Sequence, residues 1–183
     1  MKIIVAVTAA SGSIYARLVL EQLIASSQVE RIALILSDNA SEVVAYEGER
    51  LPESAKVERM DNHAMFSSVA SGSARWDAMV VVPSSMGTVG RVAAGISQTL
   101  IERAADVMLK ERRRMIFVVR ETPYSLIHLR NMTTLTEAGA IILPASPSFY
   151  SHPQSIEEVA MTVVERVVAH IGIDEQHYEF EGR

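Results

Sequence analysis

The fold class of this chain follows from residues 76–88, which read WDAMVVVPSSMGT. A short apolar strand pattern stops at Pro83 and opens into small hydroxyl residues and a glycine. Backbone N–H groups and hydroxyls in such a turn, backed by the positive end of a following helix, bind a phosphate with little side-chain bulk in the way. A similar turn at residues 8–13 (TAASGS) follows the strand pattern of residues 2–7 (KIIVAV). Two such turns predict a phosphorylated cofactor or substrate.

The rest of the chain alternates strand and helix patterns. The predicted strands are residues 2–8, 31–37, 77–83, 115–120 and 140–144, and the predicted helices are residues 13–26, 39–47, 86–94, 97–112, 124–138 and 155–171. This alternation is typical of a parallel sheet with helices on both faces, and strands covered on both faces are continuously apolar. We therefore predict an α/β, Rossmann-like (flavodoxin-like) three-layer sandwich with a mostly parallel sheet. Residues 48–75 show the weakest pattern, and we predict a long excursion there before the third strand.

A single domain accounts for the whole chain. With 183 residues and 49% apolar content, the chain can build one sizeable core, and no linker composition or internal repeat divides it. We predict one domain over residues 1–183, with a C-terminal tail from about residue 174. The apolar content exceeds what one small sheet buries, which predicts contacts between subunits in a homo-oligomer.

Composition excludes several classes of partner and site. A net charge of −5 argues against nucleic acid or an anionic membrane as the main partner. The absence of cysteine excludes disulfides and thiolate chemistry, and the five scattered histidines lack metal-ligand spacing, so we predict no metal. No apolar stretch approaches the roughly 20 residues of a membrane span, and no basic and apolar leader opens the chain. We therefore expect a cytoplasmic protein.

In an open parallel sheet, ligands bind beyond the carboxyl ends of the strands. Five polar segments follow predicted strands, so we predict that they line one cleft: residues 8–13, 37–38, 83–88, 120–121 and 145–150. Neither the G-x-G-x-x-G fingerprint nor the P-loop pattern is present, which disfavours NAD or ATP. A mononucleotide such as FMN remains open.

Three groups of charged residues have both a structural and a functional interpretation. Arg103 and Lys110 lie seven residues apart, which places them on one face of the predicted helix. In the structural interpretation both cations form ion pairs with Asp106, and in the functional interpretation they line a binding site for a phosphate. Arg120 and Glu121 directly follow a buried strand. They either form a structural ion pair at the end of the sheet or act in the reaction. The basic cluster at residues 110–114 offsets a helix dipole or, for some members, faces a phosphate.

Six segments of this sequence resemble the UbiX family of flavin prenyltransferases. They are residues 10–13 (ASGS), 83–88 (PSSMGT), 102–113 (ERAADVMLKERR), 120–123 (RETP), 127–132 (IHLRNM) and 147–150 (PSFY). The resemblance extends from Lys2 to about Ile173 and is weakest over residues 48–66. It implies transfer of a dimethylallyl group from dimethylallyl phosphate to N5 and C6 of reduced FMN, without a metal. It further implies that the product, prenylated FMN, serves UbiD-type decarboxylases, and that the chain forms dodecamers with sites at subunit junctions.

The resemblance also assigns site residues. The residues implied to hold FMN are Ala10, Ser11, Gly12, Ser37, Ser85, Met86, Gly87, Thr88 and Arg120. The residues implied to bind the phosphate of the prenyl donor are Arg103, Lys110, Tyr150 and Arg166. Glu47 and Glu121 are implied to handle protons, and the sequence leaves open which carboxylate serves which step. Cations and a phenol suit charge that develops on a leaving phosphate, and carboxylates suit proton transfer.

The sequence departs from the family pattern at three places. Ser84 stands where cysteine is common, the loop around Phe66 lacks a tryptophan found in some members, and residues 174–180 lack another, with Tyr178 or Phe180 as substitutes. Two alternative functions compete with the prenyltransferase interpretation. A flavoprotein that decarboxylates cysteine-containing substrates requires a P-x-M-N-x-x-M-W motif, which residues 140–155 do not contain. A non-catalytic carrier of FMN or prenylated FMN, associated with a decarboxylase, fits the altered aromatic loop.

Overall fold

A computed structural model of the chain describes residues 1–173. The strands are β1 (Lys2–Val7), β2 (Arg31–Leu36), β3 (Val57–Met60), β4 (Ala78–Ser84), β5 (Arg114–Val119) and β6 (Ile141–Pro144). The α-helices are α1 (Ser13–Ala25), α2 (Ala40–Tyr46), α3 (Met86–Ala93), α4 (Leu100–Lys110), α5 (Leu126–Glu137) and α6 (Ile156–Ile171). Two short 3₁₀ turns, η1 (Ser68–Ala70) and η2 (Gly72–Ala74), precede β4.

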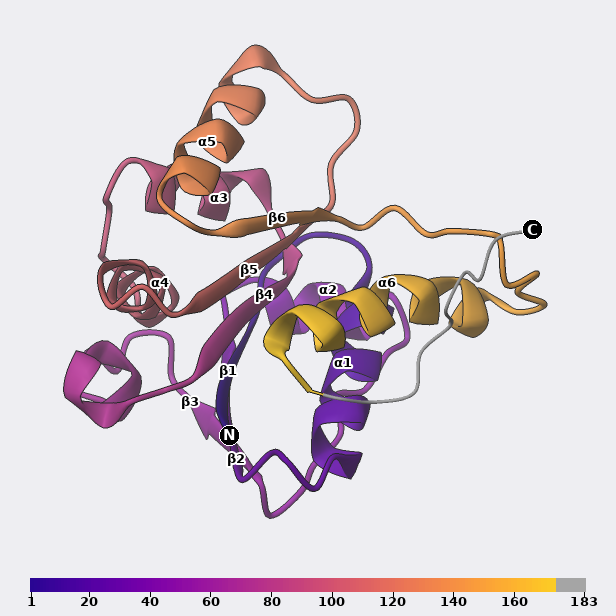
Figure 1. The fold of residues 1–183 in the computed structure, drawn as a ribbon, viewed down its shortest axis with the longest axis horizontal. Coiled ribbons are helices and arrows are strands. Elements are labelled where there is room, and N and C mark those ends of the chain that lie inside the picture. Colours follow the sequence, from indigo (N-terminus) through magenta and orange to yellow (C-terminus); the bar gives the residue numbers. More distant parts are fainter. Residues whose placement is uncertain (174–183) are drawn as a thin grey trace.

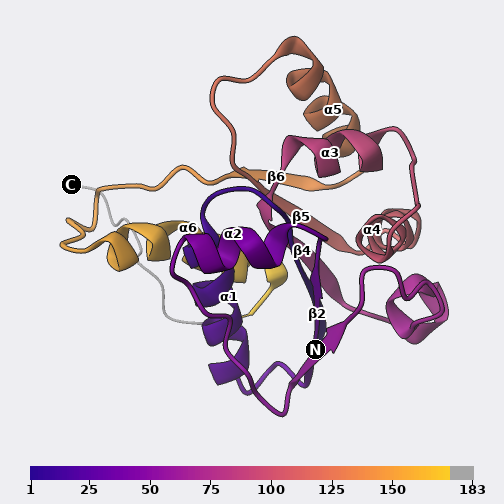
Figure 2. The ribbon, with the colours of Figure 1, turned by 180° about the vertical axis from the view of Figure 1, so that it is seen from behind.

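The strands form one parallel sheet in the order β3-β2-β1-β4-β5-β6. Helices α1, α2 and α6 cover one face, and α3, α4 and α5 cover the other (Figures 1 and 2). Alternate residues of β1 serve the two cores, since Ile3 and Val5 pack on the α1 side whereas Ile4 and Ala6 pack on the α4 side. The predicted three-layer α/β sandwich is confirmed.

The predicted excursion at residues 48–75 contains a strand that the sequence pattern missed. Strand β3 pairs in parallel with β2, from Ile32 opposite Val57 to Ile35 opposite Met60. It lies at the edge of the sheet, and its middle residues Glu58 and Arg59 are exposed, so it shows no continuous apolar run. Short charged edge strands resist pairing with other chains, which explains why this one lacks the strand signal.

Some helices begin at other residues than predicted, because the observed helix ends are set by capping residues. Helix α4 begins at Leu100 rather than at residue 97 because Thr99 and Glu102 form a capping box. Ser155 caps α6 by accepting from the N–H of Glu158, but the carboxylate of Glu158 accepts from the N–H of Gln154 at 2.6 Å, so only half of a capping box forms there. Gly139, with φ of +98°, follows the end of α5.

The aromatic residues singled out in the sequence have different surroundings. Trp76 is 2% exposed within the core under α4, whereas Phe66 is fully exposed on the excursion. Tyr178 and Phe180 lie outside the described residues. Over residues 1–173, no helix is long and apolar enough to cross a membrane. Within the same range, no group of three or more acidic or histidine side chains is arranged to hold a metal ion.

Candidate functional site

The two predicted turns lie side by side at the carboxyl edge of the sheet because β1 and β4 are neighbours. The hydroxyl of Thr8 donates to the carbonyl of Pro83 at 2.8 Å, and the N–H of Ser85 donates to the same hydroxyl at 2.8 Å. Thr8 is 2% exposed, so this link is shielded from water. One buried hydroxyl therefore fixes the two turns relative to each other.

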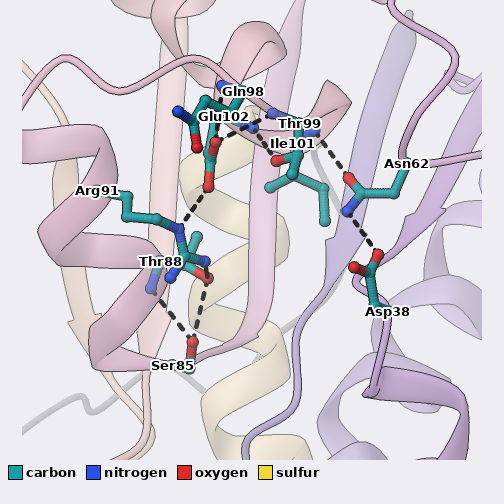
Figure 3. A network of polar contacts seen from close by, with 9 residues as sticks. All are labelled: Asp38, Asn62, Ser85, Thr88, Arg91, Gln98, Thr99, Ile101 and Glu102. Atoms are coloured by element: carbon teal, nitrogen blue, oxygen red, sulfur yellow. Dashed lines mark hydrogen bonds and ion pairs between the residues drawn. The ribbon is translucent and has the colours of Figure 1, made fainter.

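The turn after β4 forms an open cradle at the start of α3. Ser85 is the N-cap, because its Oγ accepts from the N–H of Thr88 at 3.3 Å and lies 3.1 Å from the hydroxyl of Thr88 (Figure 3). A cavity of about 320 Å³ opens in front of it. Its lining residues are Ala9, Ser37, Asp38, Asn39, Asn62, Ser85, Thr88, Arg91, Gln98, Thr99, Ile101 and Glu102. Three of the predicted FMN residues, Ser37, Ser85 and Thr88, thus share one cavity.

The turn after β1 already holds an anion that belongs to the chain itself. The carboxylate of Glu47, at the end of α2, accepts from the N–H of Gly12 at 3.0 Å and from the N–H of Ser13 at 2.7 Å. Gly12 takes φ of +105°, and a Cβ there would lie 2.8 Å from the ring of Tyr15, so only glycine fits. The structure thereby places Glu47 beside the predicted FMN residues Ser11 and Gly12, although 34 or more residues separate them in sequence.

Glu47 is held in its ionised form. Partial burial by itself would raise the pKa of this carboxyl, but hydrogen bonds from the hydroxyl of Ser11 and from the N–H groups of Ser13 and Gly12 lower the pKa below its ordinary value of 4.5. The position at the N-terminus of α1 favours negative charge further. At neutral pH the group therefore carries a negative charge.

We expect Glu47→Gln to lower the free energy of unfolding by about 1 kcal/mol at neutral pH, because the helix N-terminus loses its negative charge. A carboxyl whose folded pKa is depressed contributes stability that is fully present above its unfolded pKa and is lost as pH falls through the folded pKa. The difference between wild type and variant should therefore shrink below pH 4.5, the ordinary value. Urea unfolding between neutral and acidic pH measures it. A stability difference that stays constant with pH would contradict the stabilising role of the ionised Glu47 carboxylate. Glu30→Gln, at the opposite edge of the sheet, is the control.

The predicted pair at residues 120–121 does not form an ion pair within the described part of the chain. The N–H of Arg120 donates to the carbonyl of Ser84 at 3.2 Å, which holds the end of β5 against β4. Glu121 instead accepts from the N–H of Thr122 at 2.9 Å. The Nε of Arg120 is buried without a hydrogen-bond partner among residues 1–173. A buried donor without an internal partner needs an acceptor from water or from a ligand, and a polar group of FMN is one such acceptor.

The four residues predicted to bind the donor phosphate are divided between the two faces of the sheet. Tyr150 and Arg166 line a cavity of about 360 Å³ beside α6. Arg103 and Lys110 lie on α4, across the sheet from α6 (Figure 1). Within the described chain, therefore, one subunit does not bring the four together.

The ion pairs predicted through Asp106 form for one of the two cations. Arg103 pairs with Asp106 at 2.6 Å and donates to the carbonyl of Ala70 at 3.2 Å. Lys110 pairs with Glu111 instead. In the basic cluster, Arg114 donates to the carbonyl of Ile171 at 2.9 Å, so this cation serves the C-terminus of α6 rather than that of α4.

The cavity residues that the sequence interpretation missed include Asn62 and Arg91. Asn62 is 6% exposed, and its amide oxygen accepts from the N–H of Ile101 at 3.2 Å, which joins the excursion to α4. Arg91 pairs with the buried Glu102 at 2.5 Å (Figure 3). The pattern Thr99-x-x-Glu102 is a recognisable capping box, and it was the one sequence signal that could have located this part of the cavity.

Comparison with known proteins agrees with this geometry. The family described as Flavoprotein matches residues 1–172. Flavin prenyltransferase UbiX of Methanocaldococcus jannaschii is 42% identical over 177 residues, which cover 95% of each chain. The crystal structure of AnUbiX (PadA1) in complex with FMN and dimethylallyl pyrophosphate is similar with a TM-score of 0.87 and 39% identity over 98% of each chain. A dodecameric FMN-dependent UbiX-like decarboxylase from Escherichia coli O157:H7 gives a TM-score of 0.91 at 34% identity over the whole of both chains. The chain belongs to the UbiX family of flavin prenyltransferases within the flavoproteins.

Proposed function

We propose that this chain is a flavin prenyltransferase, which transfers a dimethylallyl group from dimethylallyl phosphate to N5 and then C6 of reduced FMN. The observation that carries the proposal is the 42% identity, over 95% of both chains, to a protein named for this activity. The structure supports it with an open anion cradle and a buried, unpaired Arg120 nitrogen at the same edge of the sheet. The product, prenylated FMN, is the cofactor that UbiD-type decarboxylases receive.

The residues at this edge suit the binding of reduced FMN. The hydroxyls of Ser37, Ser85 and Thr88 face the cavity, and Arg120 offers a guanidinium without an internal partner for its Nε. The remaining residues proposed to hold FMN belong to the same two turns: Ala10, Ser11, Gly12, Met86 and Gly87. Reduced flavin supplies the electron-rich ring atoms that take up the prenyl group.

Departure of the phosphate is the step that the protein has to assist. Breaking the allylic C–O bond leaves a carbocation and a phosphate, so donors aimed at the phosphate oxygens stabilise the charge that develops on them. We assign this role to Arg103, Lys110, Tyr150 and Arg166. We assign proton transfer to Glu47 and Glu121: one carboxylate accepts the ring proton and the other returns a proton to the leaving phosphate.

The division of these donor residues between two faces of the sheet requires a second subunit. Arg103 and Lys110 of one copy reach Tyr150 and Arg166 only if another copy supplies the latter two. Large apolar side chains on α5 support contacts between copies, since Leu126, Ile127 and Leu129 are 60%, 69% and 47% exposed. We propose a homo-oligomer, and a dodecamer by analogy with the Escherichia coli relative, that acts in the cytoplasm.

Anaerobic incubation with reduced FMN and dimethylallyl monophosphate tests the activity directly. We expect mass spectrometry to find a flavin heavier by one dimethylallyl unit, released after unfolding of the protein. A parallel sample with dimethylallyl diphosphate compares the two donors, and a sample without protein is the control. Unchanged flavin with both donors would overturn the proposal.

The alternative, a non-catalytic flavin carrier, gives a different result in the same samples. A carrier would bind FMN and prenylated FMN but would leave FMN unmodified with either donor. Because the Escherichia coli relative is described as a decarboxylase, the samples are also assayed for release of carbon dioxide from an added carboxylic acid. We expect release only when a UbiD-type decarboxylase is added to the product.

A further inference from the structure

Arg91 and Glu102 form a pair beside the open cradle that no role proposed above uses. Glu102 is 2% exposed, and its carboxylate accepts from the N–H groups of Gln98 at 2.9 Å and Thr99 at 3.0 Å as well as from Nε of Arg91. Two backbone donors on a loop and a helix cap therefore fix the carboxylate. Because the carboxylate is fixed, the guanidinium that it holds is fixed as well.

The guanidinium lies over the first turn of α3, and the Arg91 side chain as a whole is 47% exposed. Its Nη2 is 3.4 Å from the hydroxyl of Thr88 (Figure 3). A Cβ built on Gly87 would lie 3.3 Å from its Nη1. Nε points to Glu102, so the two terminal nitrogens are left on the side of Ser85 and Thr88. Among the described residues, Nη1 has no hydrogen-bond acceptor.

Arg91 is the only lysine or arginine among the described residues that line the 320 Å³ cavity. The other charged residues of the lining are Glu102, which Arg91 pairs with, and Asp38, which accepts from Asn62 at 3.3 Å and lies 3.1 Å from a ring nitrogen of His63. The cavity thus combines one oriented guanidinium, the hydroxyl residues Ser37, Ser85, Thr88 and Thr99, and the N-terminus of α3. This combination binds a phosphate monoester.

We propose that Arg91 binds the phosphate of FMN and that Glu102 is a positioning residue that aims Arg91 at it. The inference rests on the proposed function, which makes FMN a ligand of this chain. The prenyl donor also carries a phosphate, so the chemistry alone permits either molecule. The FMN phosphate is favoured because Ser85 and Thr88 lie in the same cavity as Arg91, whereas Tyr150 and Arg166 line a different cavity.

Binding of FMN and of riboflavin, which lacks the phosphate, tests the proposal without turnover. The test titrates flavin-free protein with each molecule and follows the quenching of flavin fluorescence. We expect Arg91→Ala to weaken FMN binding about 10- to 100-fold, as for loss of a charge-assisted bidentate contact, and to leave riboflavin binding unchanged. Arg91→Lys should recover part of the FMN affinity. Arg59→Ala, which removes a cation from an adjacent cavity, is the matched control and should bind FMN as the wild type does.

Glu102→Gln separates positioning from direct contact. It keeps an oxygen that accepts from Thr99 but removes the charge that holds Arg91, so we expect a smaller loss of FMN affinity and again no loss for riboflavin. Thermal melting establishes that each variant is folded. Equal loss of FMN and riboflavin affinity in Arg91→Ala would overturn the proposal, as would unchanged binding of both. A raised KM for dimethylallyl phosphate with unchanged FMN affinity would assign Arg91 to the donor instead. Failure of the prenylation assay with FMN selectivity intact would contradict the proposed function alone.

Discussion

Glu121→Gln is expected to lower the rate of flavin prenylation by about 10²- to 10⁴-fold, the range for removal of a general acid or base. The substitution leaves the fold intact because Glu121 uses one oxygen to accept from the N–H of Thr122, and the glutamine amide oxygen accepts the same bond. FMN binding should stay unchanged, since Arg120 and the α3 cradle are untouched. Single-turnover formation of the heavier flavin, measured anaerobically, gives the rate.

Glu137→Gln is the matched control for this effect. Glu137 is an exposed carboxylate on the last turn of α5, so its replacement should leave the rate unchanged. Full turnover by Glu121→Gln would remove Glu121 from proton transfer. A parallel loss of FMN affinity would instead show that Glu121 acts in flavin binding.

Mixed oligomers of two inactive variants are expected to regain activity. Lys110→Ala and Arg166→Ala each remove one cation from the proposed donor site and should each lower turnover about 100-fold, as for loss of one donor to a developing charge. The two residues lie on helices that cover opposite faces of the sheet. If each site combines α4 of one copy with α6 of another, random mixing leaves about a quarter of the sites with both cations.

Co-expression of the two variants with different tags and purification through both tags gives the mixed oligomers. Their turnover should approach one quarter of the wild-type value, far above that of either variant alone. Arg112→Ala, which removes an exposed neighbouring cation, should be fully active by itself. Mixed oligomers no more active than the parents would mean that each site lies within one chain.

The sequence determined the fold class and most elements because their signals are local. Strands such as β4 and β5 are continuous apolar runs covered on both faces, and α4 and α5 begin at residues whose side chains cap them. The edge strand β3 gave no such signal, because its exposed face carries Glu58 and Arg59. The six segments that resemble the UbiX family supplied the activity and the site residues, which spacing alone did not.

Tertiary structure decided which of those residues meet. The sequence does not show that Glu47 binds the turn at Gly12, since the contact depends on how α2 packs against the start of α1. Nor does it show that the sheet separates Lys110 from Arg166, or that Glu102 aims Arg91 at the α3 cradle. Local patterns specify helices and strands through neighbours a few residues apart, whereas these contacts join segments that only the packing of the layers brings together or keeps apart.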